Sequence, residues 1–189
     1  MVTAVQPGAA PPPTGAAPHQ PRLVLVCLST PSDPEAPAAL LPAVALRLSR
    51  ATGLPLRSIP RPDSPPQALA DLLAASGPWL APLPLDPGLA LAHGSWAEAL
   101  GAWRQPTLLV VDQAQLVTGI PAASTALLER WSVPLLGLLQ WGGGWDASAR
   151  RRDRLPWLGL LADTEGADPD ADPAALLLLS WSRWRDRLS

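Results

Sequence analysis

Two features near the middle of the chain carry residue types that could do chemistry. Asp112 comes directly after the apolar run Pro106 to Val111, where a carboxylate could hold a magnesium ion. Gly142 to Gly144 lie between Trp141 and Trp145, where glycine would let a ligand approach the backbone and the rings could stack on it. Each feature also has a structural interpretation, because Asp112 could cap the following turn and the glycines could form a flexible connector. The sequence leaves both alternatives open.

Other kinds of chemistry are excluded by composition. The chain has no lysine, and all 14 basic residues are arginine, so no ammonium can bind phosphate or form a Schiff base. It has one cysteine, Cys27, and two histidines, His19 and His93. These residues exclude a disulfide framework and a cysteine–histidine zinc cluster within one chain.

Length and charge favour one globular domain. The chain has 189 residues and 48% apolar content, enough for a single core. A net charge of −2 favours neither nucleic acid nor an acidic membrane surface, and no apolar run is long enough to cross a bilayer. Residues 1–21 are rich in alanine and proline and lack the features of a secretory signal. We expect a disordered tail over 1–21, one domain over 22–189, and a cytoplasmic protein.

The elements that would position these residues follow from hydrophobic spacing. The runs Pro106 to Val111 and Val133 to Leu139 have the length of buried strands. Between them a helix is predicted, with Pro121 in its first turn. Its predicted buried face is defined by steps of three and four residues: Leu116, Ile120, Ala123, Leu127 and Trp131. Strands joined by such a helix are parallel.

The same pattern continues on both sides of this unit. Further strands are predicted over 22–28, 54–59 and 155–161, and an edge strand or extended crossing over 79–85 because of its two prolines. Further helices are predicted up to Gly53, over 66–76, over 91–103, and from Pro173 to the end. The predicted fold is therefore three-layer α/β, with a mostly parallel sheet of five or six strands and helices on both faces.

The order of these segments resembles the dethiobiotin synthetase family, a branch of the P-loop ATPases. Pro106 to Val111 looks like the family's PVLLV strand, Leu116 to Thr118 like its LGT-type turn, and Val133 to Leu139 like its LPVLGVVLN strand. Gly77 to Leu83 is similar to GGLLVPL, and Arg61-Pro62 stands where the family has KPV. The resemblance runs from about Arg22 to Ala162.

The resemblance implies four candidate site residues. Asp112 would correspond to a Walker B aspartate that holds magnesium, and Gln140 lies near the family's adenine-reading asparagine. Thr118 and Arg61 would bind substrate, with Arg61 in place of a lysine. For Gln140 a simple polar strand end, and for Arg61 a simple exposed arginine, are the alternatives.

The family's phosphate loop has no counterpart. Its position is taken by Ser29 to Ala38, STPSDPEAPA, which has no glycine or lysine, three prolines and two carboxylates. Prolines lack the N–H groups that surround a phosphate, and carboxylates repel it. We therefore expect no bound cofactor, and a catalytically silent relative that serves as a binding or scaffold domain.

Two alternatives remain open. One is an active ATP- and magnesium-dependent ligase of biotin synthesis with an atypical loop, and the other is an unrelated flavodoxin-like ligand-binding domain. A protein partner could bind through the last helix, which combines tryptophan and arginine at Trp181, Arg183, Trp184 and Arg187. A homodimer is also open, whereas nucleic acid and membrane partners are not expected.

Overall fold

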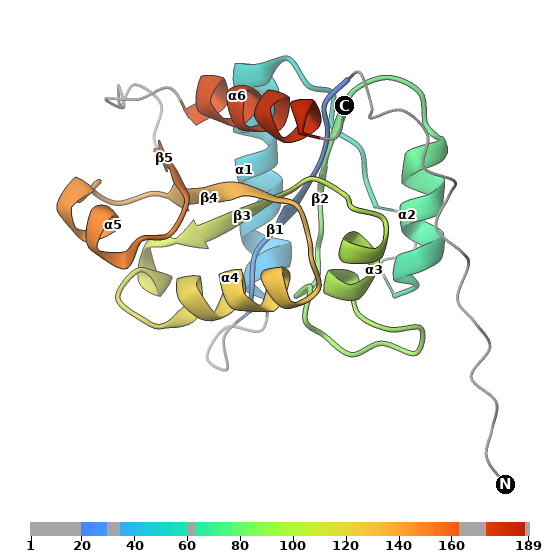
Figure 1. Cartoon of the computed structure of the whole chain (residues 1–189), viewed down its shortest axis with the longest axis horizontal. Coiled ribbons are helices and arrows are strands. Elements are labelled where there is room, and N and C mark those ends of the chain that lie inside the picture. The colour runs from blue at the N-terminus through green and yellow to red at the C-terminus, as the bar shows by residue number, and fades with distance from the viewer. Residues whose placement is uncertain (1–19, 30–34, 60–62, 163–172, 188–189) are drawn as a thin grey trace, which may run out of the picture.

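The structure, a computed structural model, describes residues 20–29, 35–59, 63–162 and 173–187, in which strands and helices alternate (Figure 1). The strands are β1 (Arg22–Val26), β2 (Trp79–Pro82), β3 (Thr107–Asp112), β4 (Leu135–Trp141) and β5 (Trp157–Leu161). The helices are α1 (Ala36–Thr52), α2 (Pro65–Ala74), α3 (Trp96–Ala102), α4 (Ile120–Arg130), α5 (Ala147–Asp153) and α6 (Pro173–Asp186). A short 3₁₀ helix, η1 (Gln113–Gln115), follows β3. Nearly all of the predicted tail, residues 1–19, lies outside the described residues.

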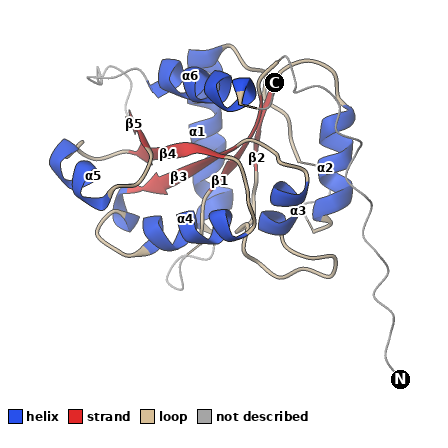
Figure 2. Ribbon diagram, viewed as in Figure 1, coloured by secondary structure: helices blue, strands red, loops and turns tan. Residues whose placement is uncertain are grey.

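The strands of the described residues form one sheet in the order β2-β1-β3-β4-β5, and all neighbouring pairs are parallel (Figure 2). Helices lie on both faces, so the predicted three-layer α/β fold is confirmed. β2 is at the edge of the sheet, as its prolines predict. None of the described helices combines the length and apolar character that a membrane crossing requires.

β1 shows how the sheet divides the core. Its residues Leu23 to Val26 are all 0% exposed. Val24 and Val26 belong to the core that includes residues of α2, α3 and α4, whereas Leu23 and Leu25 belong to the core under α1 and α6. Side chains of a strand alternate between its faces, so a strand that is apolar on both faces needs a helical layer on each side.

α1 begins and ends as its sequence predicts. Pro37 lies in its first turn, and Gly53 ends it with a left-handed φ of 73°. Pro42 lies inside the helix. The proline is tolerated because both Pro42 and Ala38, whose carbonyl loses its helical partner, are exposed to water.

The predicted strand over 54–59 is reduced to one isolated bridge, between Leu56 and Leu80 of β2. The Arg57 N–H donates to the Leu80 carbonyl, and the Leu80 N–H donates to the Pro55 carbonyl, both at 2.9 Å. Pairing goes no further because Pro55 and Pro82 have no N–H for a longer ladder. The sheet therefore has five strands rather than six.

The helix predicted over 91–103 begins later, at Trp96. Ser95 and Glu98 form a capping box, in which the Ser95 side chain accepts from the Glu98 N–H. Gly94 has a φ of 93°, which a right-handed helix cannot continue through. Leu91 and Gly94 instead form a tight turn with reciprocal backbone bonds.

The buried face of α4 matches the predicted one only in part, since Leu116 and Leu127 pack partly buried against the core. Pro121, Ser124, Thr125 and Leu128 are buried, whereas Ala123 and Trp131 are exposed. The hydroxyl groups of Ser124 and Thr125 donate to helix carbonyls four residues earlier, at 2.6 and 2.8 Å. Because these hydroxyls are satisfied within the helix, they can be buried, and an apolar-only pattern misses them.

The apolar stripe of α6 packs on the core as far as it is described; its residues, at steps of four, three and four, are Leu177, Trp181, Trp184 and Leu188. Leu177 is 1% exposed and Trp181 is 5% exposed in the core beside α1, and Trp184 packs partly buried against the same core. The remaining residue of the stripe, Leu188, lies outside the described residues. The two tryptophans therefore tie the last helix to the sheet and are not a free aromatic surface.

We predict that Gly101→Ala destabilises the fold, because a Cβ there would lie 1.8 Å from the Trp131 carbonyl oxygen, next to α4. Overpacking of this kind costs ~1–3 kcal/mol, which exceeds the roughly 1 kcal/mol by which alanine favours a helix over glycine. Gly144→Ala is the matched control, since a Cβ at Gly144 meets nothing within 4 Å. Urea unfolding should separate the two variants, and equal midpoints would contradict the close approach of α3 to Trp131.

Candidate functional site

The candidate site lies where the strands end, at the carboxyl edge of the sheet. In this strand order the chain leaves β1 toward β2 on one side, and β3 lies on the other side. Open α/β sheets bind their ligands at such a reversal of strand order, outside the carboxyl ends of the strands. The exit of β1, flanked by the segments that follow β2 and β3, is therefore the first place to search.

The exit of β1 is held by side chains from both flanks. From the β3 side, the Gln115 amide Nε2 donates to the Leu28 carbonyl at 2.8 Å. From the β2 side, the Asp86 carboxylate accepts from both the Ser29 N–H and the Ser29 hydroxyl, each at 2.8 Å. Polar groups that a ligand would meet at this exit are thus already bonded within the protein.

Asp86 is itself fixed by a turn. Its second carboxylate oxygen accepts from the Gly88 N–H at 2.7 Å, in an Asp-Pro-Gly sequence typical of turns. The side chain is half-buried. Sequence reasoning missed Asp86 as a site residue, because the turn could be predicted from residues 86–88 but its contact with Ser29, 57 residues away, could not.

Asp112 is at the predicted place, the end of β3, and its carboxylate caps η1. Asp112 Oδ2 accepts from the Ala114 N–H at 3.0 Å, and the Gln115 Oε1 accepts from the Asp112 N–H at 3.1 Å. The two residues form a capping box, whose spacing is readable in the sequence. Gln115 of η1 therefore links two segments, because its Oε1 binds the end of β3 at Asp112 and its Nε2 binds the exit of β1 at Leu28.

Thr118 is exposed and also serves the backbone. Its hydroxyl donates to the Gln115 carbonyl at 2.6 Å and accepts from the Ile120 N–H at 3.2 Å, at the start of α4. The fourth candidate, Arg61, lies outside the described residues. Asp112, Thr118 and Gln140 all follow or end strands at one edge, so the structure brings three of the four candidates to the same side of the sheet.

Gln140 is fully buried, at 0% exposure, in the last part of β4. Its Nε2 donates to the carbonyls of Gly142 and Gly144, at 2.9 and 3.0 Å. Its Oε1 has no hydrogen-bond partner among the described residues. Gln140 is thus the internal support of the glycine loop, with one acceptor still open.

The glycine loop is further pinned by Gln113 of η1. Gly143 has a φ of 70°, and a Cβ there would lie 2.7 Å from the Gln113 side chain. The Gly142 N–H donates to the Leu161 carbonyl at the end of β5. Hydrogen bonds from Gln140 and to Leu161 thus hold Gly142 to Gly144 at the ends of β4 and β5.

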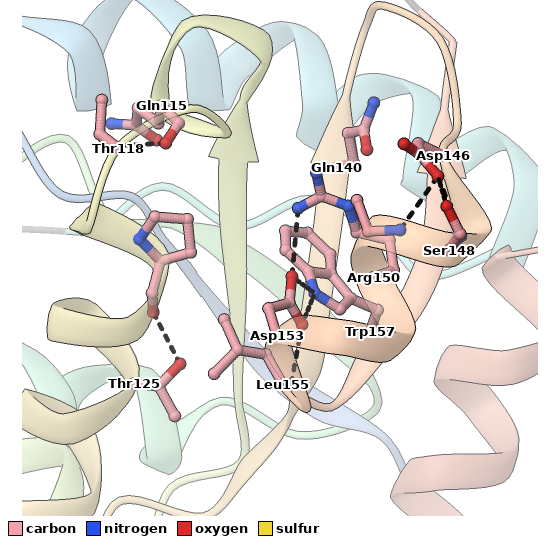
Figure 3. Close-up of polar contacts among 12 residues, drawn as sticks. Gln115, Thr118, Thr125, Gln140, Asp146, Ser148, Arg150, Asp153, Leu155 and Trp157 are labelled. Atoms are coloured by element: carbon pink, nitrogen blue, oxygen red, sulfur yellow. Dashed lines mark hydrogen bonds and ion pairs between the residues drawn. The ribbon is translucent and has the colours of Figure 1, made fainter.

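α5 follows this loop and was not predicted. Asp146 caps it by accepting from the N–H groups of Ser148 and Ala149 and from the Ser148 hydroxyl (Figure 3). The Ser148 hydroxyl bond, followed by the Ala149 bond, lowers the pKa of Asp146 below its ordinary value of 3.8. The helix has no buried residues, so it carries no apolar periodicity from which it could be predicted.

Tryptophan and arginine hold α5 against β5. The Arg150 guanidinium lies 4.6 Å from the Trp157 ring centre, and Trp145 meets Trp157 edge to face at 6.2 Å between ring centres. Both oxygens of Asp153 accept from the Trp157 indole N–H at 3.0 Å (Figure 3). Asp153 also forms an ion pair with Arg150 at 3.4 Å. These contacts make a rigid base at the β4–β5 end of the carboxyl edge.

A shallow apolar depression of about 190 Å³ lies at the start of α1. Its lining residues are mostly proline and aliphatic: Pro37, Leu41, Pro42, Ser58, Ile59, Pro82 and Pro84. Ser58 is the one polar side chain in this lining. Such a lining could accept a small apolar group, but it offers no charged group to a phosphate or a carboxylate.

Neither a cluster of metal ligands nor a matching known protein identifies a ligand for this site. No group of three or more histidine, cysteine or carboxylate side chains comes together within the described ranges. No protein-family model matches the chain, and no curated protein matches it.

We predict that Gln140→Glu destabilises the fold more than Gln140→Met. Methionine only removes the two donated bonds, a loss of ~1–3 kcal/mol, whereas a carboxylate would also place a buried charge against the Gly142 and Gly144 carbonyls. Burial raises the pKa of a glutamate above about 4.3. The free energy of unfolding of the Gln140→Glu variant should therefore fall as the pH rises from about 4.3 to the raised pKa, and recover in acid. Unfolding midpoints of both variants at about pH 5 and pH 8 check this, and a pH-independent difference would contradict it.

Proposed function

We propose that this protein is a degenerate dethiobiotin synthetase-like domain that has lost ATP binding and acts as a non-catalytic binding or scaffold domain. The proposal rests on the resemblance in segment order and on the chemistry of the exit of β1. At the described carboxyl edge, carboxylate and amide side chains form hydrogen bonds with the protein's own backbone.

The observation that carries the proposal is the contact of Asp86 with Ser29. Ser29 is the first residue of the segment that stands where the family has its phosphate loop. Its N–H and hydroxyl, the groups that would bind a phosphate, both bond to the Asp86 carboxylate at 2.8 Å. A phosphate at this place would lose those donors and meet a negative charge, which makes binding unfavourable.

Asp112 and Arg61 show what the ligase alternative would require. In the ligase alternative the Asp112 carboxylate would hold magnesium, yet Oδ2 already accepts from the Ala114 N–H. Arg61 would have to replace a lysine on the substrate side, and no lysine occurs in the chain. The ligase alternative thus requires Asp86 to release Ser29 when nucleotide binds, whereas Asp112 could keep its bond to Ala114 and offer its other oxygen to the metal.

The flavodoxin-like alternative is favoured by one observation, the strand order. The order β2-β1-β3-β4-β5 is the flavodoxin-like order, with the ligand expected between the ends of β1 and β3. In this chain that position is occupied by the Gln115 amide on the Leu28 carbonyl. The bridge at Leu56 also places a short extended segment beside β2, outside the five-stranded order. Because of this segment and the position of Gln115, we rank the flavodoxin-like alternative second.

A thermal-shift comparison tests the proposal, with ATP–Mg²⁺, a diamino acid and buffer as the three conditions. A ligand present at 100 times its Kd would stabilise the fold by ~2.7 kcal/mol, a shift of several degrees for a domain of this size. We expect no shift with ATP–Mg²⁺ at millimolar concentration. Asp112→Ala is the control for magnesium-dependent binding.

Each other result points to one alternative. An ATP–Mg²⁺ shift that disappears in Asp112→Ala would overturn the proposal in favour of the ligase. A shift with the diamino acid alone would show a retained pocket without phosphoryl transfer. Asp86→Asn removes the carboxylate charge at Ser29, and we expect it to create at most a weak affinity for free phosphate, because the loop still lacks glycine and lysine.

A further inference from the structure

α5 and the residues beside it present an exposed arginine patch. We define the α5 patch as Arg151, Arg152, Arg154 and Trp145, all of them exposed, with Trp145 at 37%. The side chains of the three arginines form no hydrogen bond or ion pair with another described residue. Three exposed guanidinium groups therefore lie within four positions of the sequence, and Arg152 interacts electrostatically with Asp146.

The two acidic residues nearest to the patch offset only part of its charge, and both are also hydrogen-bonded within the protein. Asp146 accepts three hydrogen bonds at the start of α5. Asp153 is bound by Trp157, by Arg150 and by the Leu155 N–H at 3.0 Å. Between Trp145 and Trp157 the sequence has four arginines and two aspartates, a local charge of +2, on a chain whose net charge is −2.

The patch stands on a rigid base. Arg150 is mostly buried, with 12% of its side chain exposed, and it stacks on Trp157. Trp157 in turn contacts Trp145 edge to face. α5 has only seven residues and buries none of them, so these contacts and the Asp146 cap hold it in place. A preorganised surface of arginine and tryptophan has the composition of protein-binding hot spots.

The class of partner follows from charge and from the aromatic geometry. Single-stranded nucleic acid needs open ring faces for its bases, but a face of Trp157 is covered by Arg150. The net negative charge of the chain also opposes a long polyanion. A short acidic peptide would feel mainly the local +2 and could pair its carboxylates with guanidinium groups, two bonds at a time.

We propose that the α5 patch is a docking surface for an acidic, extended segment of a partner protein. The carboxylates of the partner pair with Arg151, Arg152 and Arg154, and Trp145 contacts its backbone or apolar side chains. This inference deepens the proposed binding role and rests on it. Its failure is separable from that of the proposed function, because ATP–Mg²⁺ binding is measured independently of peptide binding.

The test uses the full chain and a fluorescent peptide that alternates aspartate and alanine, with an asparagine–alanine peptide as the control ligand. Fluorescence anisotropy should show binding of the aspartate peptide alone, weakening as salt is raised. Arg151→Gln with Arg152→Gln should weaken binding by roughly two- to five-fold per arginine, as expected for exposed charge pairs.

A matched pair of variants separates binding from stability. Arg154 has a left-handed φ of 57° at the end of α5, and Arg104 has a left-handed φ of 48° after α3, on a different part of the molecule (Figure 1). Glycine suits both backbones, so Arg154→Gly and Arg104→Gly should each raise the unfolding midpoint. Only Arg154→Gly should weaken peptide binding. Equal binding by the two variants would overturn the inference.

Two other occupants are outcomes of the same test. Tighter binding of a single-stranded oligonucleotide than of the aspartate peptide, lost in the Arg151→Gln and Arg152→Gln variant, would replace the protein partner with nucleic acid. The chain also has five acidic residues between 163 and 172. If the peptide bound only after these five were changed to asparagine and glutamine, the patch would be occupied by the chain's own segment, and the partner proposal would be wrong.

Discussion

The structure depends on the burial of β1 on both of its faces. Four consecutive side chains, from Leu23 to Val26, are inaccessible to solvent and alternate between two cores. Each face must therefore be covered by helices, with α1 and α6 on one side and α2, α3 and α4 on the other. Parallel strands joined by helices that cover both faces meet this requirement.

The same constraint explains the polar chemistry at the carboxyl edge. When a buried strand ends, its last peptide groups need partners, because unpaired polar groups near a core are costly. In this protein Asp86 and Gln115 supply those partners to Ser29 and Leu28. These bonds join the loops after β2 and β3 to the exit of β1.

At the β4–β5 end of the carboxyl edge, polar side chains hold a loop and a helix in place. Gln140 uses its amide to hold the glycine loop, and Asp146 and Asp153 use their carboxylates to hold α5. Arg150 is held in the aromatic base, and Arg151, Arg152 and Arg154 after it are exposed. At the exit of β1 the polar groups of the carboxyl edge are therefore hydrogen-bonded within the protein. At α5 the charged arginine side chains are exposed to solvent.

Much of the fold could be predicted from the sequence, because its signals are local. Apolar runs marked the strands, Pro37 and Gly53 marked the limits of α1, and the prolines around β2 marked an edge strand. Two of the errors arose where polar groups have hydrogen-bond partners close to them in the sequence. Ser124 and Thr125 are buried through bonds within α4, and α5 is held by caps and stacking without an apolar stripe.

By itself the sequence determined the alternation of strands and helices, the burial of the sheet on both faces, and the absence of a glycine- and lysine-rich phosphate loop. These depend on residue type and on spacing over a few turns of chain. Only the tertiary structure decided which side chains meet at the carboxyl edge, since Asp86 lies 57 residues from Ser29 and Gln115 lies 87 residues from Leu28. Contacts over such separations are set by strand order and register, which hydrophobic periodicity does not encode.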